Sequence, residues 1–466
     1  MALQIDSSIT AASLLPAVKR MWALSAEKIS NLDASWPREK GTPVFTCDGT
    51  YTTRGWTEWT EGFQHGASVL QFDATGETRF LELARRRTQE KMASHVSHMG
   101  VHDHGFNNVS TYGALHRLAV AGRFEASREE IAFYELALKV SGAVQAARWS
   151  RTSDGRGFIY SFNGPQSLFI DTVRSLRSLI VAHTLGHALM GEQDRRIDLL
   201  ERACTHGSVT AAHNVYYGRG RDAFDIPGRV AHESLFNPND GQYRCPSSQQ
   251  GYSPFSTWTR GLAWALCGFS EQLQFLETLN ADQPIGTTTI GACCAQYLEA
   301  ARVTAEFYLG HACADGVPFW DTGAPNLWRL EGALDRVSDP FNAWEPVDSS
   351  AAAIAAQGFM RLAECQGLKS SKLSKRYRQA GLNIAHTLLA EPYLSTGRKH
   401  QGLLLHSVYH RPNGWDHVRK GQKVPNGESS MWGDYHLREL ALLVQRAAEK
   451  REQPCFFKPS RLAPAA

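Results

Sequence analysis

Twelve segments of helical periodicity, joined by short and long links, are the feature of this chain that most restricts its fold. They run near 12–31, 58–74, 77–95, 108–121, 127–149, 166–190, 194–208, 257–278, 289–311, 348–366, 371–390 and 430–450. Short links, such as those at 73–76 and 367–370, indicate antiparallel helical hairpins. Long links cover 209–256, 312–347 and 391–429. This alternation predicts hairpins that close into a ring, with the elaborated loops at one end.

Twelve helices make six hairpins, so we expect an all-α fold, the (α/α)6 barrel or six-hairpin toroid. We expect it to form a single catalytic domain over residues 1–452, followed by a C-terminal tail over 453–466. The competing arrangement is an open superhelix of helix pairs. The sequence shows no repeat of fixed length, which counts against a regular solenoid.

Two helix patterns separate an apolar face from a polar one. In the segment 257–278, Trp258, Leu262 and Phe269 fall on one apolar stripe. In the segment 166–190, Asp171 and Ser175 lie on a small polar face apart from the apolar stripe. If outer helices cover the inner ones, such a polar face lines a cavity.

Residue types that often serve in catalysis or ligand binding cluster where helices are expected to start. They are Trp56, Trp59, Asp103, Asp171, Trp258, Arg260, Asp348, Trp432 and Asp434. If alternate helices form an inner ring and run in parallel, these positions converge on one mouth. Two carboxylates facing an aromatic-lined cavity, Asp103 and Asp171, are what acid/base chemistry on a sugar requires. For Asp348 and Asp434, helix capping is the favoured interpretation.

The charge and cysteine patterns exclude several classes of protein. A net charge of +3, from 49 basic and 46 acidic residues without long runs, argues against a nucleic-acid partner. The sequence contains no stretch of 18 apolar residues, so we expect no membrane span. Residues 1–10 lack a signal-peptide pattern. Nine cysteines without Cys-x-x-Cys spacing indicate a reducing, cytoplasmic location. The oligomeric state is left open.

A histidine cluster follows the third helical segment, with members at His95, His98, His102 and His104. Its spacing fits no standard zinc signature. We therefore predict no metal and no cofactor, and expect His102 to shape the site beside Asp103.

The order of short motifs along the chain resembles glycoside hydrolase family 88, the unsaturated glucuronyl hydrolases. The motifs are Trp59-Thr-Glu-Gly-Phe63, His102-Asp-His-Gly-Phe106, Ile170-Asp171, Gln250-Gly-Tyr252, Ser256-Thr-Trp-Thr-Arg-Gly-Leu-Ala-Trp264, Asp315-Gly-Val-Pro-Phe-Trp-Asp321, Asp348-Ser-Ser-Ala-Ala352 and Met431-Trp-Gly-Asp-Tyr435. They span residues 50 to 440, nearly the whole chain. The family has an (α/α)6 barrel, in agreement with the helix count.

The resemblance implies a role for each matched residue. Asp171 looks like the general acid/base and Asp103 like its partner carboxylate. The residues that look like the substrate-binding shell are His232, Gln250, Arg260, Trp258 and Trp264. Trp59 and Phe106 offer further flat faces for sugar stacking, and we expect Arg260 to pair with a uronate through a bidentate fork.

The implied reaction acts on oligosaccharides left by polysaccharide lyases, which carry a C4–C5 double bond in the non-reducing uronic acid. Protonation of C4 and addition of water at C5 give an unstable hemiketal, which opens and releases the remaining sugar. The donor must be protonated near neutral pH, and we expect the Asp103 carboxylate to raise the pKa of Asp171 for this purpose.

Three positions depart from the family pattern. Ser253-Pro254-Phe255 replaces a segment that usually carries aspartate, and Ser175 stands where an asparagine is usual. A tryptophan expected shortly before Ile170 is absent, and Tyr160 or Phe162 is expected in its place. The parent polysaccharide, its linkage and its sulfation therefore stay open.

Other functions remain as alternatives. An unsaturated rhamnogalacturonyl hydrolase would share the barrel and the chemistry. A sugar epimerase would need a pair of histidine bases, for which His232 alone is poor support. A non-catalytic carbohydrate binder would be expected to lose one of the two aspartates, and both are present. The segment 406–411 is expected either to contact the leaving sugar or a sulfate, or to be a solvated loop.

Overall fold

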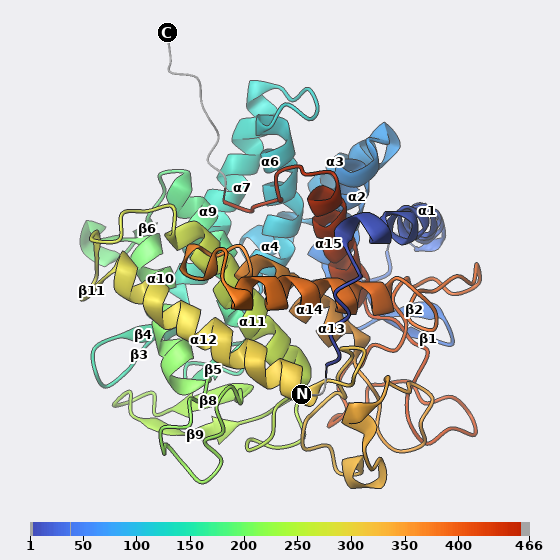
Figure 1. Cartoon of the computed structure of the whole chain (residues 1–466). Helices are drawn as coiled ribbons and strands as arrows, with labels where there is room; N and C mark the ends of the chain where they lie inside the picture. The colour runs from blue at the N-terminus through green and yellow to red at the C-terminus, as the bar shows by residue number, and fades with distance from the viewer. Residues whose placement is uncertain (1–2, 38, 458–466) are drawn as a thin grey trace.

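The computed structural model describes residues 3–37 and 39–457, and all twelve predicted helical segments are present in it (Figure 1). Its α-helices are α1 (Ala11–Ser35), α2 (Glu61–Thr75), α3 (Thr78–Lys91), α4 (Ala93–Val96), α5 (His104–Asn107), α6 (Ala114–Val120), α7 (Arg128–Ala147), α8 (Thr172–Ser175), α9 (Arg177–Thr184), α10 (Leu199–His213), α11 (Thr259–Leu276), α12 (Ile290–His311), α13 (Ser349–Leu362), α14 (Lys372–Leu388) and α15 (Met431–Ala448). A π-helical turn, Val109–Gly113, joins α5 to α6.

Six helical units form a closed inner ring. Around this ring α2 contacts α5, α5 contacts α8, α8 contacts α11, α11 contacts α13, α13 contacts α15, and α15 returns to α2. Every residue of α13 is buried, because helices lie on both of its sides. The prediction of an (α/α)6 barrel is confirmed, and the contact between α15 and α2 excludes the open superhelix.

The outer ring consists of α1, α3, α7, α10, α12 and α14. Each packs against the inner helix of its own hairpin, as α12 does on α11 and α14 on α13. Figure 1 shows α12 and α14 crossing in front of α11 and α13, with long loops gathered in the lower part of the view. Each inner helix follows a long or irregular link, and these links form the looped end. The inner helices therefore all begin there.

The strands are short and belong to the loops. They form the hairpins β1 (Pro43–Cys47) with β2 (Thr50–Thr53), β3 (Trp149–Arg151) with β4 (Gly157–Ile159), β6 (Leu189–Met190) with β7 (Arg196–Ile197), and β10 (Pro284–Ile285) with β11 (Thr288–Thr289). A three-stranded antiparallel sheet has the order β5 (Ser167–Phe169), β8 (Glu233–Phe236), β9 (Tyr243–Ser247).

One predicted helix is shorter than expected. The segment 166–190 is helical only from Thr172 to Thr184, because residues 167–169 pair with β8 as strand β5. The apolar run at Phe169 and Ile170 is therefore partly a buried strand. Its long-range partner, β8, lies in the link 209–256, and a periodicity count cannot detect that pairing.

Gly105 fixes how closely two inner helices approach each other. A Cβ atom at this position would lie 2.1 Å from the carbonyl oxygen of Ser175, far inside van der Waals contact. The start of α5 therefore lies directly against the backbone of α8, a packing that only glycine allows.

The described part of the predicted tail packs on the barrel. The ring of Phe457 lies 5.3 Å from that of Phe275, and the Pro454 carbonyl accepts a hydrogen bond from Arg361. Residues 458–466 lie outside the described residues, so the boundary at 452 stays a prediction. None of the described helices is both long enough and apolar enough to cross a membrane. All nine cysteines are unpaired.

Candidate active site

The two predicted aspartates meet at the looped end of the inner ring. Asp103 precedes α5 and Asp171 precedes α8, and neither carboxylate makes a capping hydrogen bond to its helix. Both residues are buried, with 7% and 9% of their surface exposed. Between them lies His102, whose Nε2 is 3.3 Å from Oδ1 of Asp171 and 3.7 Å from Oδ1 of Asp103. The geometry therefore forms a buried Asp–His–Asp group, in place of two helix caps.

The electrostatics of this group differ from the expectation. Burial raises the pKa of Asp103, and the charge of Asp171 adds to that rise against the opposing charge of His102. Burial also disfavours ionised Asp171, but the hydrogen bond and charge of His102 outweigh it and lower the pKa of Asp171. The raised pKa therefore belongs to Asp103 and not to Asp171, because the imidazole lies closer to Asp171.

His102 is the third member of the group. Burial disfavours its protonated form, but the negative charges of Asp103 and Asp171 outweigh burial and raise the pKa of the imidazole. Its side chain is 1% exposed. A proton held here is shielded from bulk water and faces both carboxylates.

Ser175 and Gln145 tie the two aspartate-bearing segments together. The Ser175 hydroxyl donates to the carbonyl of His102 at 2.6 Å and accepts from the Gly105 amide at 2.9 Å. The Gln145 side-chain amide donates to the same carbonyl at 2.7 Å and to the Ser175 hydroxyl at 2.9 Å. The serine that replaces the family's usual asparagine thus connects α8 to the turn that carries Asp103.

His232 faces the group in a fixed tautomer. Its Nδ1 accepts hydrogen bonds from the backbone amides of Gln249, at 3.0 Å, and Gln250, at 3.3 Å. Burial lowers the pKa of His232 to about 4, so the ring is neutral and its proton sits on Nε2. That buried nitrogen has no hydrogen-bond partner among the described residues. His232 therefore offers a free N–H donor and cannot accept a proton at Nε2.

Arg260 has a different role from the one expected. Its Nη2 donates to Oε1 of Gln250 and to the carbonyl of Tyr409, both at 2.8 Å, while Nη1 bonds the Val408 carbonyl and lies 3.5 Å from Oδ2 of Asp348. The side chain is 1% exposed. The expected fork toward a uronate is thus already occupied by protein acceptors, and Arg260 anchors the loop after residue 405.

That loop, the segment 406–411, is not solvated. Residues 406 to 410 are all buried. Besides Arg260, Asp416 holds it by accepting from the amides of Tyr409, at 2.6 Å, and His410, at 3.1 Å. Arg260 joins the Tyr409 carbonyl to the side chain of Gln250, whose backbone amide bonds His232, so the loop reaches the site. The solvated-loop alternative is wrong.

The aromatic residues of the site differ in how far their side chains are buried. Trp264 and Phe106 are each 1% exposed and their rings lie 5.0 Å apart, so both belong to the barrel core. Trp258 is also buried, with its ring 4.7 Å from that of His232. Trp59 is half-buried and stacks on Trp432 at 5.1 Å.

Of the two residues considered for the missing tryptophan, Phe162 lies over His102. Its ring stacks on His102 at 5.9 Å, and the side chain is 50% exposed. Tyr160 instead lies beside Arg148, whose guanidinium is 4.3 Å from its ring. Phe162 therefore provides the open aromatic surface next to Asp171.

Asp348 and Asp434 turn out differently from each other. Asp348 caps α13 by accepting from the amides of Ser350 and Ala351, as expected. Asp434 is not a cap, since Ser430 caps α15. The Asp434 carboxylate accepts instead from the amides of residues 403 and 404, at 2.8 Å each, and from the Tyr51 hydroxyl at 2.9 Å.

Arg148 was not anticipated. It is buried at the end of α7, where Nη2 donates to the Ser161 carbonyl at 2.7 Å and Nε to the Tyr160 carbonyl at 3.1 Å. Its charge opposes the rise in the pKa of Asp103. A basic residue at a helix end is ordinary in sequence, so only the spatial neighbours reveal that Arg148 supports the site.

The histidine cluster does not form a metal site in the described part of the chain. His95 Nε2 lies 2.7 Å from Oε2 of Glu61, and His104 is bonded to the Ser141 hydroxyl and the His98 carbonyl at 3.0 Å each. The imidazoles of His95 and His104 are therefore engaged separately.

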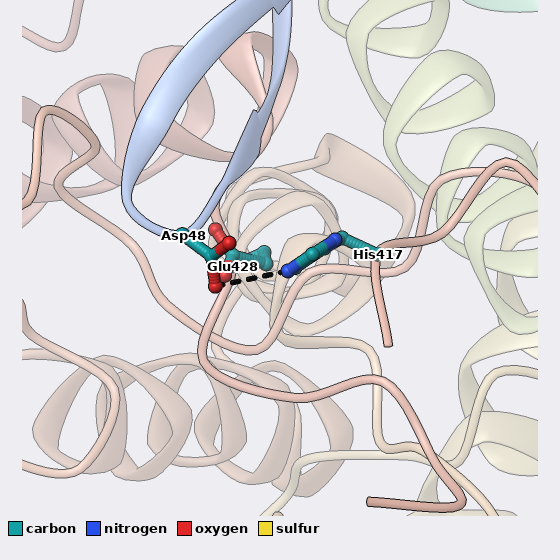
Figure 2. Close-up of side chains that lie close together, drawn as sticks. All are labelled: Asp48, His417 and Glu428. Carbon is teal, nitrogen blue, oxygen red and sulfur yellow. Dashed lines mark hydrogen bonds and ion pairs between the residues drawn. The ribbon is translucent and has the colours of Figure 1, made fainter. Parts of the chain in front are cut away.

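Within residues 3–37 and 39–457, one group has ligand atoms close enough to hold a cation, and it lies away from the aspartates. Figure 2 shows Asp48, His417 and Glu428, with ligand atoms within 4.8 Å of one another. Arg419 already lies there, with Nη2 3.1 Å from Oε1 of Glu428 and Nε 3.9 Å from Oδ1 of Asp48. This arginine balances the carboxylates, so the group is an ion-pair cluster.

The fold and the site together define a class: an (α/α)6 barrel with paired buried aspartates at one mouth. No family model matches the chain. Two similar curated proteins are an unsaturated glucuronyl hydrolase of Bacillus sp. (strain GL1), 26% identical over 400 residues, and an unsaturated chondroitin disaccharide hydrolase of Streptococcus pyogenes, 25% identical over 406. The matches cover 84% and 85% of this chain, and 87% and 84% of those proteins.

Solved structures agree on the fold. The crystal structure of the Bacillus sp. GL1 unsaturated glucuronyl hydrolase has a TM-score of 0.70 at 21% identity, covering 96% of this chain and 99% of that one. A mutant of the Streptococcus agalactiae unsaturated glucuronyl hydrolase, complexed with dGlcA-GalNAc6S, has a TM-score of 0.63 at 18% identity, covering 96% and 94%. The resemblance to the unsaturated glucuronyl hydrolases seen in the motifs is confirmed.

Proposed function

We propose that this protein is a glycoside hydrolase that removes a 4,5-unsaturated uronic acid from the non-reducing end of lyase-generated oligosaccharides. The observation that carries this proposal is the buried group of Asp103, His102 and Asp171 at the mouth of a closed barrel. The names of the related proteins, unsaturated glucuronyl and chondroitin disaccharide hydrolases, support the same substrate class.

The reaction needs one proton, one water molecule and no redox partner. The double bond is an enol ether, so adding a proton to C4 leaves an oxocarbenium ion shared between C5 and the ring oxygen. Water then forms a bond to C5 and gives its proton to the carboxylate that donated the first one. That proton regenerates the acid. The hemiketal then opens to a ketone at C5, which leaves C1 as a hemiacetal, and collapse of this hemiacetal to an aldehyde releases the remaining sugar.

Asp171 is the proposed acid/base and Asp103 its partner. Before substrate binds, the short approach of His102 keeps Asp171 ionised and the proton on the imidazole. A uronate carboxylate bound nearer to Asp171 than to His102 adds a negative charge that raises the pKa of Asp171 more than that of the imidazole. The anionic substrate itself therefore moves the proton from His102 onto Asp171, where C4 receives it.

His232 and Phe162 complete the proposed site. The free Nε2–H of His232 donates to a sugar hydroxyl or to the attacking water, because its other nitrogen is held by two backbone amides. Phe162 presents an exposed face for stacking on the sugar. Arg260 and Trp264 shape the cavity from within the core.

The geometry of His232 also bears on the epimerase alternative. A histidine base must accept a proton, and Nε2 of His232 already carries one. His102 is committed to two carboxylates. The pair of free histidine bases that an epimerase requires is therefore not formed by these two residues.

The test is a panel of disaccharides produced by lyases from chondroitin, hyaluronan, heparin, ulvan, xanthan and gellan, with an unsaturated rhamnogalacturonyl disaccharide added. Turnover removes the ultraviolet absorbance of the alkene, and reaction in heavy water should leave one deuterium on C4. Loss of absorbance with no deuterium at C4 would contradict the mechanism. Folded protein that consumes none of these compounds would contradict the proposed function.

The compartment follows from the thiols. Nine unpaired cysteines, several of them buried, are typical of a protein that folds under reducing conditions, so we place the enzyme in the cytoplasm.

A further inference from the structure

A cavity of about 380 Å³ lies on the outer wall of the barrel, between the β3–β4 hairpin and the start of α10. Five arginines contribute to its lining: Arg151, Arg156, Arg195, Arg196 and Arg202. None of the residues assigned to the catalytic mouth lines it. Its volume suits a small polar ligand, since binding pockets commonly measure a few hundred cubic ångströms.

Most of this positive charge is unpaired. In the described part of the chain, no carboxylate oxygen lies within 4.0 Å of the guanidinium groups of Arg151, Arg195, Arg196 or Arg202. Arg156 differs, because its Nη2 lies 2.7 Å from Oδ2 of Asp154. Surface arginines elsewhere in this chain commonly have an acidic partner, such as Arg85 with Glu130.

The two acidic residues of the lining are fewer than its five arginines. Asp198 and Glu201 both contribute to it. Asp198, however, accepts from the amides of Leu200, at 2.7 Å, and Glu201, at 3.0 Å, as the cap of α10. Its carboxylate is therefore directed to the helix end.

Arg202 is held in place among the arginines that line the cavity. Its Nη1 donates to the Ala146 carbonyl at 2.9 Å, and its guanidinium lies 4.2 Å from the ring centre of Trp149. Burial and the charges of Arg195 and Arg151, against the opposing charge of Glu201, lower its pKa to about 10. Positive charge is thus concentrated around the fixed guanidinium of Arg202, and a bound anion would relieve the repulsion.

We propose that this cavity is a second, non-catalytic binding site for an anionic oligosaccharide. Guanidinium groups bind carboxylate and sulfate through paired hydrogen bonds, and the hydroxyls of Thr205 and Thr287 in the same lining suit sugar hydroxyls. The choice of a sugar as the ligand rests on the proposed function, because the substrates proposed there are uronic-acid oligosaccharides. Such a site holds longer anionic chains on the enzyme while their ends are processed.

The experiment uses the whole protein and a chondroitin sulfate hexasaccharide with a saturated non-reducing end, which is not a substrate. Calorimetry should show binding by the wild type, weakened about tenfold in Arg195→Gln/Arg196→Gln. The matched control is Arg20→Gln/Arg128→Gln, which removes the same charge from exposed positions outside the cavity and should retain the wild-type affinity. The salt dependence of binding should also weaken in the first variant alone.

Other probes identify the ligand chemistry. Maltohexaose should not bind, and inorganic sulfate and a polyphosphate of matched charge should bind more weakly than the hexasaccharide. Equal affinity for the polyphosphate, or equal losses in the two double variants, would overturn the proposal. Turnover of an unsaturated disaccharide is measured separately and should be unchanged in Arg195→Gln/Arg196→Gln. A protein that binds the hexasaccharide through these arginines but consumes no disaccharide would refute the proposed function and leave this site standing.

Discussion

His102 and Asp171 come from two different inner hairpins, and the imidazole Nε2 lies 3.3 Å from the carboxylate Oδ1. Asp103, the neighbour of His102 in sequence, lies slightly farther from the same nitrogen, at 3.7 Å. The ring therefore links the two acids across the mouth. The ionisation of Asp171 therefore depends on His102, which the sequence motif places next to Asp103 and far from Asp171.

Replacing Asp171 with Asn should remove activity while the fold is retained. General acid–base catalysis is worth about 10²–10⁴-fold, and an amide of the same shape cannot deliver the proton. Alkene absorbance gives the rate, and circular dichroism checks the fold. Asp240→Asn, in an exposed loop, is the control and should act like the wild type. A rate for Asp171→Asn within a few-fold of the wild type would exclude Asp171 as the acid.

The stability contributed by His102 should depend on pH. Its folded pKa is raised above 6.5, so its contribution is complete below pH 6.5 and is lost as the pH rises through the folded value. The pKa of Asp171 is lowered from 3.8, so its contribution is present above pH 3.8 and is lost as the pH falls through the folded value. The difference in free energy of unfolding between wild type and His102→Gln should therefore be largest between pH 3.8 and 6.5.

This comparison is made by denaturant unfolding of both proteins at each pH. The difference should shrink on moving to alkaline pH. A difference that grows above neutrality would show that the imidazole is not held protonated by the two carboxylates.

Asp348→Asn should mainly cost stability. Asparagine keeps a capping oxygen, but the buried guanidinium of Arg260, 3.5 Å away, loses its charge partner. Breaking a buried ion pair typically costs about 3–5 kcal/mol, and this long pair should lie near the lower end of that range. Asp198→Asn is the control, because Asp198 caps α10 and no arginine among the described residues lies within 4.0 Å of its carboxylate. Equal losses of unfolding free energy in the two variants would assign the effect to capping alone.

Gly105→Ala should weaken the fold and the reaction together. The new methyl group would lie 2.1 Å from the Ser175 carbonyl oxygen, so α5 and α8 must separate. Overpacking of this kind typically costs about 1–3 kcal/mol, and it moves Asp103 relative to Asp171. Gly310→Ala is the helical control, since nothing lies within 4 Å of its added Cβ, and it should be neutral or stabilising. A Gly105→Ala variant with wild-type kinetics would mean that this close packing does not position the aspartates.

The barrel was predictable because long helices carry a strong periodic signal. The pairing of Asp103 with Asp171 followed from one further step, that parallel inner helices start at the same end. Short strands carry no such signal, so the sequence predicts helix at Ser167–Phe169, where the structure has strand β5. Its partner lies more than 60 residues away, in β8.

The roles of individual polar groups were harder to predict, since they depend on neighbours distant in sequence. The sequence predicts that Arg260 contacts the substrate, but in the structure its guanidinium donates a hydrogen bond to the carbonyl of Tyr409, 149 positions away. The raised pKa fell on Asp103 because the imidazole of His102 lies closer to Asp171, on a segment whose backbone carbonyl is bonded by Ser175 and Gln145. Residue types alone identified the aspartates but not how they share a proton.

The seating of α15 between α13 and α2 has a consequence for assembly of the enzyme. Helices separated by more than 350 residues must meet before the mouth is enclosed, and contacts of such long sequence separation form slowly. During synthesis, a chain that lacks α15 has both aspartates but no complete wall around them. Catalytic competence should thus arise late, when the final hairpin docks, and not hairpin by hairpin.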